Sequence, residues 1–361
     1  MNQLTFLLYI LNETISQPVL KLFDENKLEQ LSNPDLSTEN FLNTTHLTPK
    51  HRNKFLSILN SYTKAEYENS LLKHNIGAFN FLDSGYPSLL RQIPDRPLIL
   101  YVRGSLPKQK VNLAMIGSRR KTQYGIRVCK QILQVLNNQR LSIVSGLAYG
   151  IDAECHSRAI DNNLHTTAVL ATGLDDNSLY PKENYQLAQR ILQSGGTLVS
   201  EYPPLTPALP YRFVARNRII AGLSNAVLVV ECAEKSGALI TTDYALDYNR
   251  DVFAVPGDIF LKQSAGPNSL IKQGAEILSK PSDILEYLKL SPVSSPASDL
   301  RLFSSDEQTV LKCMQTESIS FDLLLSRTGL ASHQLQSLLT HLEIKGALTQ
   351  IGHQQYQKSD T

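Results

Sequence analysis

The chain has 361 residues, which favours two or three domains, and its apolar share of 42% is enough to bury their cores. A charged share of 19% argues against extended disorder, and the net charge of +2 taken alone disfavours a nucleic-acid partner. No stretch is typical of a signal peptide or of a membrane span, and the four cysteines are far apart with no CxxC pair. We therefore expect a cytoplasmic protein with reduced cysteines and without a metal site, and no membrane association.

Residues 1–75 are predicted to form a small helical domain. Leucine and isoleucine recur there at helical spacing, as at Phe55, Leu56, Ile58 and Leu59, and the alternation typical of strands is missing. The prolines at 34 and 49 divide the segment into short helices. No residue pattern in this segment indicates chemistry.

Residues 76–288 are predicted to form an α/β domain. Short apolar runs at 98–102, 113–116, 142–145, 166–171, 197–200, 226–231 and 252–255 read as strands. Helical patterns lie between them at 124–138, 151–160, 185–193, 213–223 and 239–248. This alternation is typical of βαβ units, so we expect a doubly wound sheet of buried parallel strands.

A Ser/Pro-rich stretch at 291–299 predicts a linker over residues 289–303, followed by a winged-helix domain over 304–358. In that domain, 305–308 reads as a capping box, a second helix runs from about Ser320 to Gly329, and Ser332 is the expected cap of a third. Residues 348–351 and 354–356 flank Gly352 as a short hairpin.

The third helix of this domain is predicted to expose a weakly basic face, formed by Gln334, Gln336, Thr340, His341 and Glu343. Such a face argues against reading of the major groove, and docking of another protein is at least as well favoured.

Positive charge is segregated along the chain. Residues 96–151 contain no Asp or Glu but ten Lys or Arg: Arg96, Arg103, Lys108, Lys110, Arg119, Arg120, Lys121, Arg127, Lys130 and Arg140. A second acid-free stretch, 202–230, contains Arg212, Arg216 and Arg218. This segregation creates a local positive field that the net charge hides, although a solvated basic face is the alternative.

Glycines and hydroxyl residues follow the predicted strands, at 117–119, 145–150, 172–175, 200–204, 231–238 and 255–258. Ligands of open α/β sheets bind beyond the carboxyl ends of the strands, where backbone N–H groups and helix N-termini attract anions. A glycine at one strand end is usually only a turn. Several of them on one sheet edge predict a shared anion site.

Fingerprints of cofactors and of common catalytic sites are absent: there is no GxGxxG, GxxxxGK[ST], HExxH or GxSxG. We therefore expect no cofactor. Carboxylates at strand ends (Glu201, Glu231 and Asp258) and the group Asp152, Glu154 and His156 at a helix start could serve a hydrolase as acid and base. Capping and loop hydrogen bonds are the favoured alternative.

Residues 213–221 combine an aromatic residue with arginines. Phe213 and Arg216 are three residues apart on one helical face, and Arg218 flanks them. Aromatic rings that stack bases beside cations that hold phosphates are typical of single-stranded nucleic-acid sites. The alternative is a core Phe with arginines paired to acids elsewhere in the chain. The absence of any acid within ten residues weakens that alternative.

Eight motifs occur in an order that closely resembles the DNA-processing protein A family, also called DprA or Smf. They are GSR at 117–119, SGLAYGID at 145–152, YPKEN at 180–184, SEYP at 200–203, FVARNRIIAG at 213–222, SGALIT at 236–241, VPG at 255–257 and GPNSLIKQGA at 266–275. The resemblance covers about 85–280 and implies an extended Rossmann-like domain. The end regions fit the SAM-like helical and winged-helix additions common in that family.

The resemblance implies a protein that is not an enzyme. Members bind single-stranded DNA, dimerise through the Rossmann-like domain and load RecA during natural transformation. By motif, Arg119 holds a phosphate, Lys182 and the group around Phe213 line the same pocket, and Arg212 replaces a basic residue often found before the Phe. The expected nucleic-acid site is Gly117, Ser118, Arg119, Arg120, Gly146, Lys182, Arg212, Phe213, Arg216, Asn217, Arg218, Ser236 and Gly237.

Two other classes are weighed against this hypothesis. Nucleotide-binding N-glycosidic hydrolases of the lysine-decarboxylase-like superfamily carry PGGxGTxxE, whereas the equivalent stretch here is EKSGALIT at 234–241, without the final Glu. A transcription regulator that uses the winged helix is disfavoured by the weak charge of that domain. Binding of a polymer backbone at 117–119 is therefore the preferred interpretation.

Overall fold

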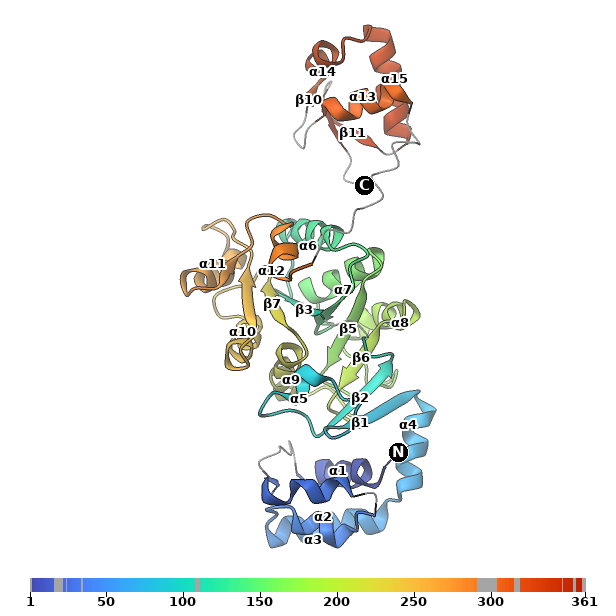
Figure 1. The fold of residues 1–361 in the computed structure, drawn as a ribbon, viewed down its shortest axis with the longest axis vertical. Helices are drawn as coiled ribbons and strands as arrows, with labels where there is room; N and C mark the ends of the chain where they lie inside the picture. The colour runs from blue at the N-terminus through green and yellow to red at the C-terminus, as the bar shows by residue number, and fades with distance from the viewer. Residues whose placement is uncertain are drawn as a thin grey trace. The chain divides into compact units, whose positions relative to one another are not determined.

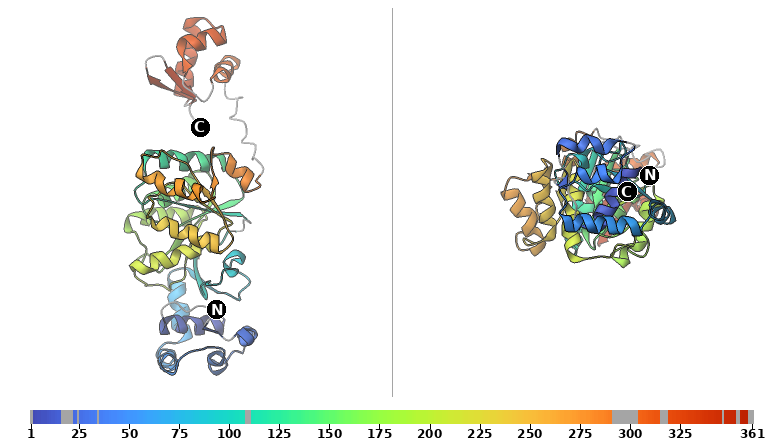
Figure 2. Two further views of the ribbon diagram at one scale, coloured as in Figure 1. Left: turned by 90° about the vertical axis from the view of Figure 1, so that its left-hand side faces the viewer. Right: turned by 90° about the horizontal axis from the view of Figure 1, so that it is seen from below.

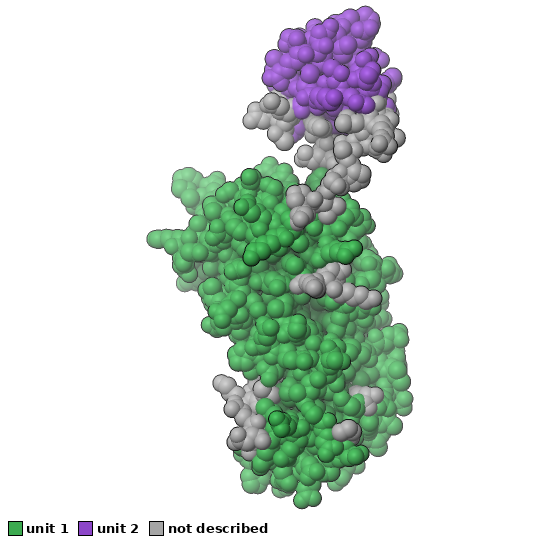
Figure 3. Space-filling model, viewed as in Figure 1, with its two compact units in different colours: residues 1–291 green, residues 292–361 purple. Residues whose placement is uncertain are grey.

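The structure is a computed structural model that describes residues 2–15, 22–23, 25–33, 35–107, 111–290, 304–314, 319–345, 347–352 and 355–358. It consists of two compact units, residues 1–291 and 292–361, coloured separately in Figure 3. The predicted linker stretch at 291–299 and the hairpin residues 353–354 lie outside the described residues. The finer boundary between residues 75 and 76 stays a prediction.

The described part of the N-terminal segment is helical, as the sequence predicts: α1 (Gln3–Thr14), the 3₁₀ helix η2 (Glu25–Ser32), α2 (Thr38–Asn43), α3 (Pro49–Ser61) and α4 (Lys64–Lys73). Local chemistry sets the starts of these helices. Asn2 caps α1 by accepting from the Thr5 N–H at 2.9 Å, and Thr63 forms a capping box with Glu66 at the start of α4.

Within the described residues of the first unit, nine strands form one sheet in the order β1-β2-β6-β5-β4-β3-β7-β8-β9 (Figure 1). Their bounds are β1 (Ile76–Asn80), β2 (Ile99–Gly104), β3 (Val111–Ile116), β4 (Leu141–Ser145), β5 (His165–Leu170), β6 (Thr197–Ser200), β7 (Ala226–Val229), β8 (Asp251–Ala254) and β9 (Glu276–Ile277). The strands from β6 through β3 to β9 pair in parallel, which confirms the doubly wound fold class.

The first edge of the sheet differs from the all-parallel expectation. The predicted strand at 98–102 is β2, which pairs antiparallel with both β6 and β1. The connection between β1 and β2 holds only the short helix α5 (Ser88–Arg91) and no long crossover helix, so the chain reverses instead of crossing over. The strands β1 and β9 were missed because their sequences are short and weakly patterned.

Helices between the strands cover the sheet (Figure 2). They are α6 (Gln123–Val135), α7 (Ile151–Asp161), η3 (Lys182–Asn184), α8 (Tyr185–Gln193), α9 (Pro210–Gly222), α10 (Gly237–Asp247), η4 (Lys262–Ser264), α11 (Ala265–Lys272) and α12 (Asp283–Tyr287). Alternate residues of each strand enter different cores. In β3, Leu113 and Met115 pack with α6 and α7, whereas Ala114 and Ile116 join the core that contains α8, α9 and α10.

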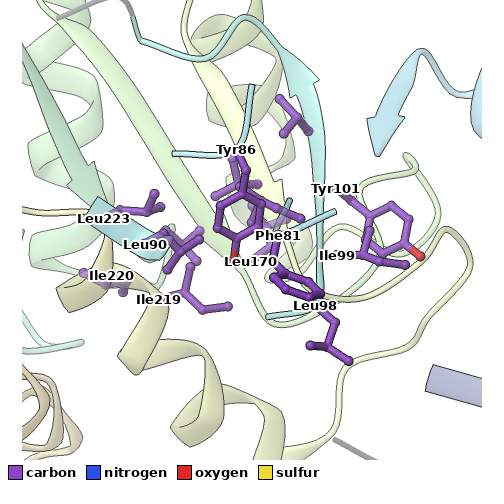
Figure 4. Packing of buried hydrophobic residues seen from close by; sticks show 14 of the residues in the cluster. Phe81, Tyr86, Leu90, Leu98, Ile99, Tyr101, Leu170, Ile219, Ile220 and Leu223 are labelled. Carbon is purple, nitrogen blue, oxygen red and sulfur yellow. The ribbon is translucent and has the colours of Figure 1, made fainter. Parts of the chain in front are cut away.

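The helix α9 is fixed by the core at its C-terminal half. Figure 4 shows Ile219, Ile220 and Leu223 beside Leu90 and Tyr86, all members of one buried cluster. The N-terminal helices belong to this cluster too, and the hydroxyls of Tyr67 in α4 and Tyr101 in β2 are hydrogen-bonded at 2.8 Å. The C-terminal half of α9 is thus anchored in the core, whereas its first turn is partly exposed.

The second unit contains α13 (Ser305–Cys313), β10 (Ile319–Ser320), α14 (Phe321–Thr328), α15 (Ser332–Ile344), β11 (Leu348–Gly352) and β12 (Gln355–Lys358). Its described strands form a sheet in the order β10-β12-β11. The polar face predicted for α15 is exposed, and Leu335, Leu339 and Leu342 are buried on the opposite face. Three helices with this hairpin form the predicted winged helix.

Two predicted caps in this unit are wrong by one residue. Ser304, and not Ser305, caps α13, because its partner Glu307 both reaches back to the Ser304 N–H at 2.7 Å and binds Lys345. Ser332 is the first residue of α15, and Ala331 precedes the helix without a side-chain hydrogen bond. In the part of the chain that the structure describes, no helix has the length and apolar character needed to cross a membrane.

Candidate nucleic-acid interface

The candidate site lies where the order of the sheet reverses. The strands β3 and β7 are neighbours in the sheet. The strand that follows β3 in the chain, β4, lies on one side of this pair, and the strand that follows β7, β8, lies on the other, so the carboxyl ends of β3 and β7 form a topological switch point. The Ser118 N–H donates to the carbonyl of Glu231 at 2.7 Å and joins the two strand ends. A pocket of about 530 Å³ opens there, and we call it the switch-point pocket.

Most of the predicted site residues line this pocket. They are Gly117, Ser118, Arg119 and Arg120 after β3, Phe213, Arg216 and Asn217 on α9, and Ser236 and Gly237 at the start of α10. The sequence places these three groups far apart, and the topology brings them to one edge of the sheet. The predicted juxtaposition of the strand-end corners is therefore present.

Buried polar groups hold the basic corner in shape. A Cβ on Gly117 would lie 2.7 Å from the Glu231 carbonyl, so only glycine lets the chain turn there. The buried Glu231 carboxylate accepts from the Thr122 N–H at 2.7 Å and from its hydroxyl at 2.5 Å, which fixes the start of α6. Ser118 accepts from the Arg120 N–H at 3.0 Å. These bonds leave the arginine side chains at the surface.

Cations without acidic partners surround the switch-point pocket. Arg119, Arg120, Lys235 and Lys262 are exposed, and no carboxylate among the described residues forms an ion pair with any of them. Ser236 caps α10 by accepting from the Ala238 N–H at 3.2 Å, so the positive end of that helix dipole also faces the pocket. The site is suited to an anion.

An aromatic ring lies beside these cations. The Arg119 guanidinium is 5.8 Å from the centroid of the Phe213 ring, and Phe213 is half-buried. The Tyr180 ring meets Phe213 edge to face with centroids 5.6 Å apart. A cation next to a partly accessible ring can hold a phosphate and stack the attached base.

Arg216 is buried and supports the floor of the pocket. Its Nη1 donates to the carbonyl of Gly146 at 2.5 Å and to that of Val169. Burial lowers the pKa of Arg216 to about 10, with the charge of Asp152 opposing that shift. A Cβ on Gly146 would overlap with the guanidinium, so glycine is required for this approach. Gly146 therefore contributes through Arg216 and does not itself line the pocket.

Asp152 accepts from the N–H groups of Gly146 at 3.1 Å and Ala148 at 3.4 Å. Burial raises the pKa of the Asp152 carboxyl, and the nearby Arg216 charge and these hydrogen bonds oppose that shift. The carboxyl thus ties the loop before α7 to the floor of the pocket.

Besides Gly146, three predicted residues lie outside the switch-point pocket. Arg218 is buried and pairs with Glu201 at 2.5 Å and with Asp95 at 3.8 Å, which is the distant-acid alternative that the sequence left open. Lys182 is exposed and donates to the carbonyl of Asn177 at 2.5 Å. Arg212 lines a different pocket. The assignment of these residues to DNA binding stays a prediction.

The carboxylates considered for acid–base catalysis all have internal partners. Besides the bonds of Asp152, Glu201 and Glu231, Glu154 binds Lys121 at 2.5 Å and Arg158 at 2.8 Å, and Asp258 accepts from the Phe260 N–H at 2.9 Å. His156 is buried, and burial lowers its pKa to about 3. Among the described residues, no cluster of His, Cys, Asp and Glu is suited to a metal ion. Each of these carboxylates therefore has at least one internal hydrogen-bond or ion-pair partner.

Sequence reasoning missed three contributors to the site. Lys235 and Lys262 line the switch-point pocket, and Tyr180 contacts Phe213. Each had a signal: Lys235 directly precedes the glycine corner at 236–237, Lys262 follows the corner at 255–258, and Tyr180 opens the YPKEN motif.

Comparisons with known proteins show which family the chain resembles. The family model of DNA recombination-mediator protein A matches residues 78–289, and that of the DprA winged helix domain matches residues 284–352. Protein Smf of Escherichia coli is 39% identical over 270 residues, which cover 72% of this chain and 72% of that protein. DNA processing protein DprA of Streptococcus pneumoniae is 42% identical over 209 residues, 58% of this chain and 73% of that protein.

Two solved structures are also similar. The X-ray structure of DNA processing protein A from Streptococcus pneumoniae has a TM-score of 0.69 at 33% identity and covers 79% of this chain and 98% of that one. A structure of DNA processing protein A from Helicobacter pylori has a TM-score of 0.54 at 26% identity and covers 59% of this chain and 95% of that one. The latter was solved to describe the single-stranded DNA binding mode of that protein.

Proposed function

Because this chain belongs to the DNA recombination-mediator protein A family, we propose that it binds single-stranded DNA in the switch-point pocket. The observation that carries the proposal is the combination of unpaired Arg119 with the Phe213 ring at 5.8 Å, at the edge where open α/β sheets bind their ligands. Arg120, Lys235 and Lys262 extend the positive surface along the pocket mouth. The Helicobacter pylori relative, described as a single-stranded DNA binder, supports the same ligand.

We further propose that the protein protects incoming DNA and loads RecA recombinase on it during natural transformation, in the cytoplasm. A homodimer formed through the Rossmann-like domain would hold one strand at two pockets and raise the avidity. The polar, weakly charged face of α15 fits a role of the winged helix in docking of a partner protein. Stimulation of RecA ATP hydrolysis on single-stranded DNA by the wild-type protein tests the loading step.

Binding without catalysis fits the partners of the carboxylates. An acid–base pair needs groups free to exchange protons with a substrate, whereas Asp152 and Glu231 are engaged in internal hydrogen bonds and one carboxylate oxygen of Glu201 is held by Arg218. Release of a free base from nucleotides or DNA, lost in Asp152→Asn or Glu201→Gln, would favour the N-glycosidic hydrolase instead.

The test of the DNA site is affinity for an oligodeoxythymidine over a salt series, for the wild type, Arg119→Ala and Arg127→Ala. Arg127 is exposed on α6 and does not line the pocket, so it controls for the loss of one positive charge. We expect Arg119→Ala to weaken binding roughly tenfold and to reduce the salt slope by about 0.7 for each lost phosphate contact. Equal binding by Arg119→Ala and Arg127→Ala would contradict the assignment.

A further inference from the structure

Consecutive residues in the first turn of α9 line two different pockets. Phe213 and Val214 line the switch-point pocket. Tyr211 and Arg212 line a second pocket of about 550 Å³, formed with α1, α3, the start of β2 and the loop after β6. The two pockets therefore share the N-terminal turn of α9 as a common wall.

The second pocket contains planar groups suited to stacking. The Arg212 guanidinium lies 4.7 Å from the ring centroid of Tyr202 and 5.7 Å from that of Tyr211. Its Nη1 donates to the Pro207 carbonyl at 2.6 Å, which fixes the orientation of the guanidinium. The Tyr211 side chain is 49% exposed, so its ring is accessible. Aromatic rings and arginine planes of this kind stack unpaired bases.

Three buried polar atoms of the residues that line this pocket have no partner within the described part of the chain, and one of them is the Nε of Arg212. Among the described residues, neither Oε1 of Glu201 nor the hydroxyl of Tyr202 has a hydrogen bond, although the Glu201 side chain is only 10% exposed. Its other oxygen, Oε2, is held by Arg218 at 2.5 Å. Buried polar atoms are normally paired, so a carboxylate acceptor and a hydroxyl await a ligand that carries both donors and acceptors. The edges of nucleobases carry both.

The charge of this pocket favours a base over a phosphate. Lys54 and Arg212 are accompanied by Glu13 and Glu201, and the Lys54 ammonium already donates to the Thr14 carbonyl at 2.8 Å. Burial raises the pKa of Glu13, while Lys54 and Arg212 oppose that shift. Phosphates have a better place in the switch-point pocket, where the exposed Arg119, Arg120 and Lys235 have no acidic partner among the described residues.

We propose that the second pocket is a nucleobase subsite. It takes one base of the same single strand whose phosphates bind in the switch-point pocket. The proposal rests on the proposed function, because it requires a strand in the first pocket. Tyr211 and Arg212 supply the stacking surfaces, and Glu201 and Tyr202 meet the base edge.

The test uses the full chain and fluorescently labelled oligodeoxynucleotides of increasing length. We expect the affinity of the wild type to rise once the strand is long enough to reach the second pocket. Tyr211→Ala should lose roughly tenfold in affinity for these longer strands and bind the shortest ones as the wild type does. Tyr211→Phe keeps the ring and should restore the affinity. Leu72→Ala, at a residue 73% exposed on α4, is the matched surface control.

The outcomes separate this proposal from the proposed function. Ultraviolet cross-linking of bromodeoxyuridine-substituted strands should attach Tyr211 or Tyr202 in the wild type. If Arg119→Ala weakens binding but Tyr211→Ala matches the wild type at every length, the second pocket is not a subsite and the function stands. Equal weakening by Tyr211→Ala at all lengths also overturns the subsite. If the wild type does not bind single-stranded DNA, both proposals are wrong.

Discussion

The Arg216 guanidinium fits under the loop before α7 only because residue 146 is glycine. Its Nη1 donates to the Gly146 carbonyl at 2.5 Å, in the space that a side chain at 146 would occupy. This contact connects the end of β4 to α9. Phe213 lies on the same helix, one turn before Arg216. The position of the Phe213 ring beside Arg119 therefore depends on a residue that does not itself line the pocket.

We expect Gly146→Ala to lower both stability and DNA affinity. The new methyl group would push the guanidinium away, break its bond to the carbonyl and shift α9, at an overpacking cost of about 1–3 kcal/mol. Thermal unfolding and single-strand binding measure the two effects. Gly77→Ala is the control, since a Cβ at 77 on β1 would meet no atom closer than 3.4 Å and the residue does not line the pocket. Unchanged affinity in a destabilised Gly146→Ala protein would mean that the contact between Arg216 and Gly146 does not position Phe213.

Replacement of Arg216 by methionine should destabilise the protein by about 3 kcal/mol. Two buried carbonyls, those of Gly146 and Val169, would lose their donor, and the buried Asp152 carboxylate would lose the positive charge that opposes its pKa shift. A second change, Asp152→Asn, should recover part of the loss because it removes the uncompensated charge. A double-mutant cycle in denaturant measures this coupling, and simple additivity of the two changes would contradict it.

Arg218 and Arg119 should behave in opposite ways. Arg218 is buried in ion pairs with Glu201 and Asp95, so Arg218→Met leaves buried charges unpaired and should cost about 3–5 kcal/mol of stability. Arg119 is exposed, so Arg119→Met should change stability by less than about 0.5 kcal/mol while weakening DNA binding. Urea unfolding and anisotropy on the same samples compare the two. A stable Arg218→Met protein that no longer binds DNA would instead indicate that Arg218 contacts DNA.

Regular patterns made the fold predictable, and contacts between distant segments limited the prediction of the site. The seven predicted strands are present because continuous apolar runs flanked by glycine leave little choice of structure. The corner at 117–119 was predictable because a glycine, a hydroxyl and a cation follow a strand directly. Arg218 was not, since its acidic partners lie 17 and more than a hundred residues away along the chain. Charge counts within ten residues cannot detect such pairs.

His156 should make stability depend on pH below about 6.5. Burial lowers the pKa of His156 from 6.5 to about 3, so between these values the unfolded chain binds a proton that the folded chain does not. The stabilisation is complete above the unfolded pKa and is lost as pH falls, by up to about 1.4 kcal/mol per pH unit.

Comparison of the wild type with His156→Gln isolates this contribution from those of the carboxyl groups. The difference in their free energies of unfolding should shrink, or change sign, as pH falls from 6.5 to 4.5. Only the wild type has a ring that takes up a proton in the unfolded chain and stays neutral in the folded one. Urea unfolding at each pH measures it, and His165→Gln, at a less buried histidine, gives a shallower slope. A constant difference across this range would mean that the ring is reached by solvent and takes up its proton in the folded state.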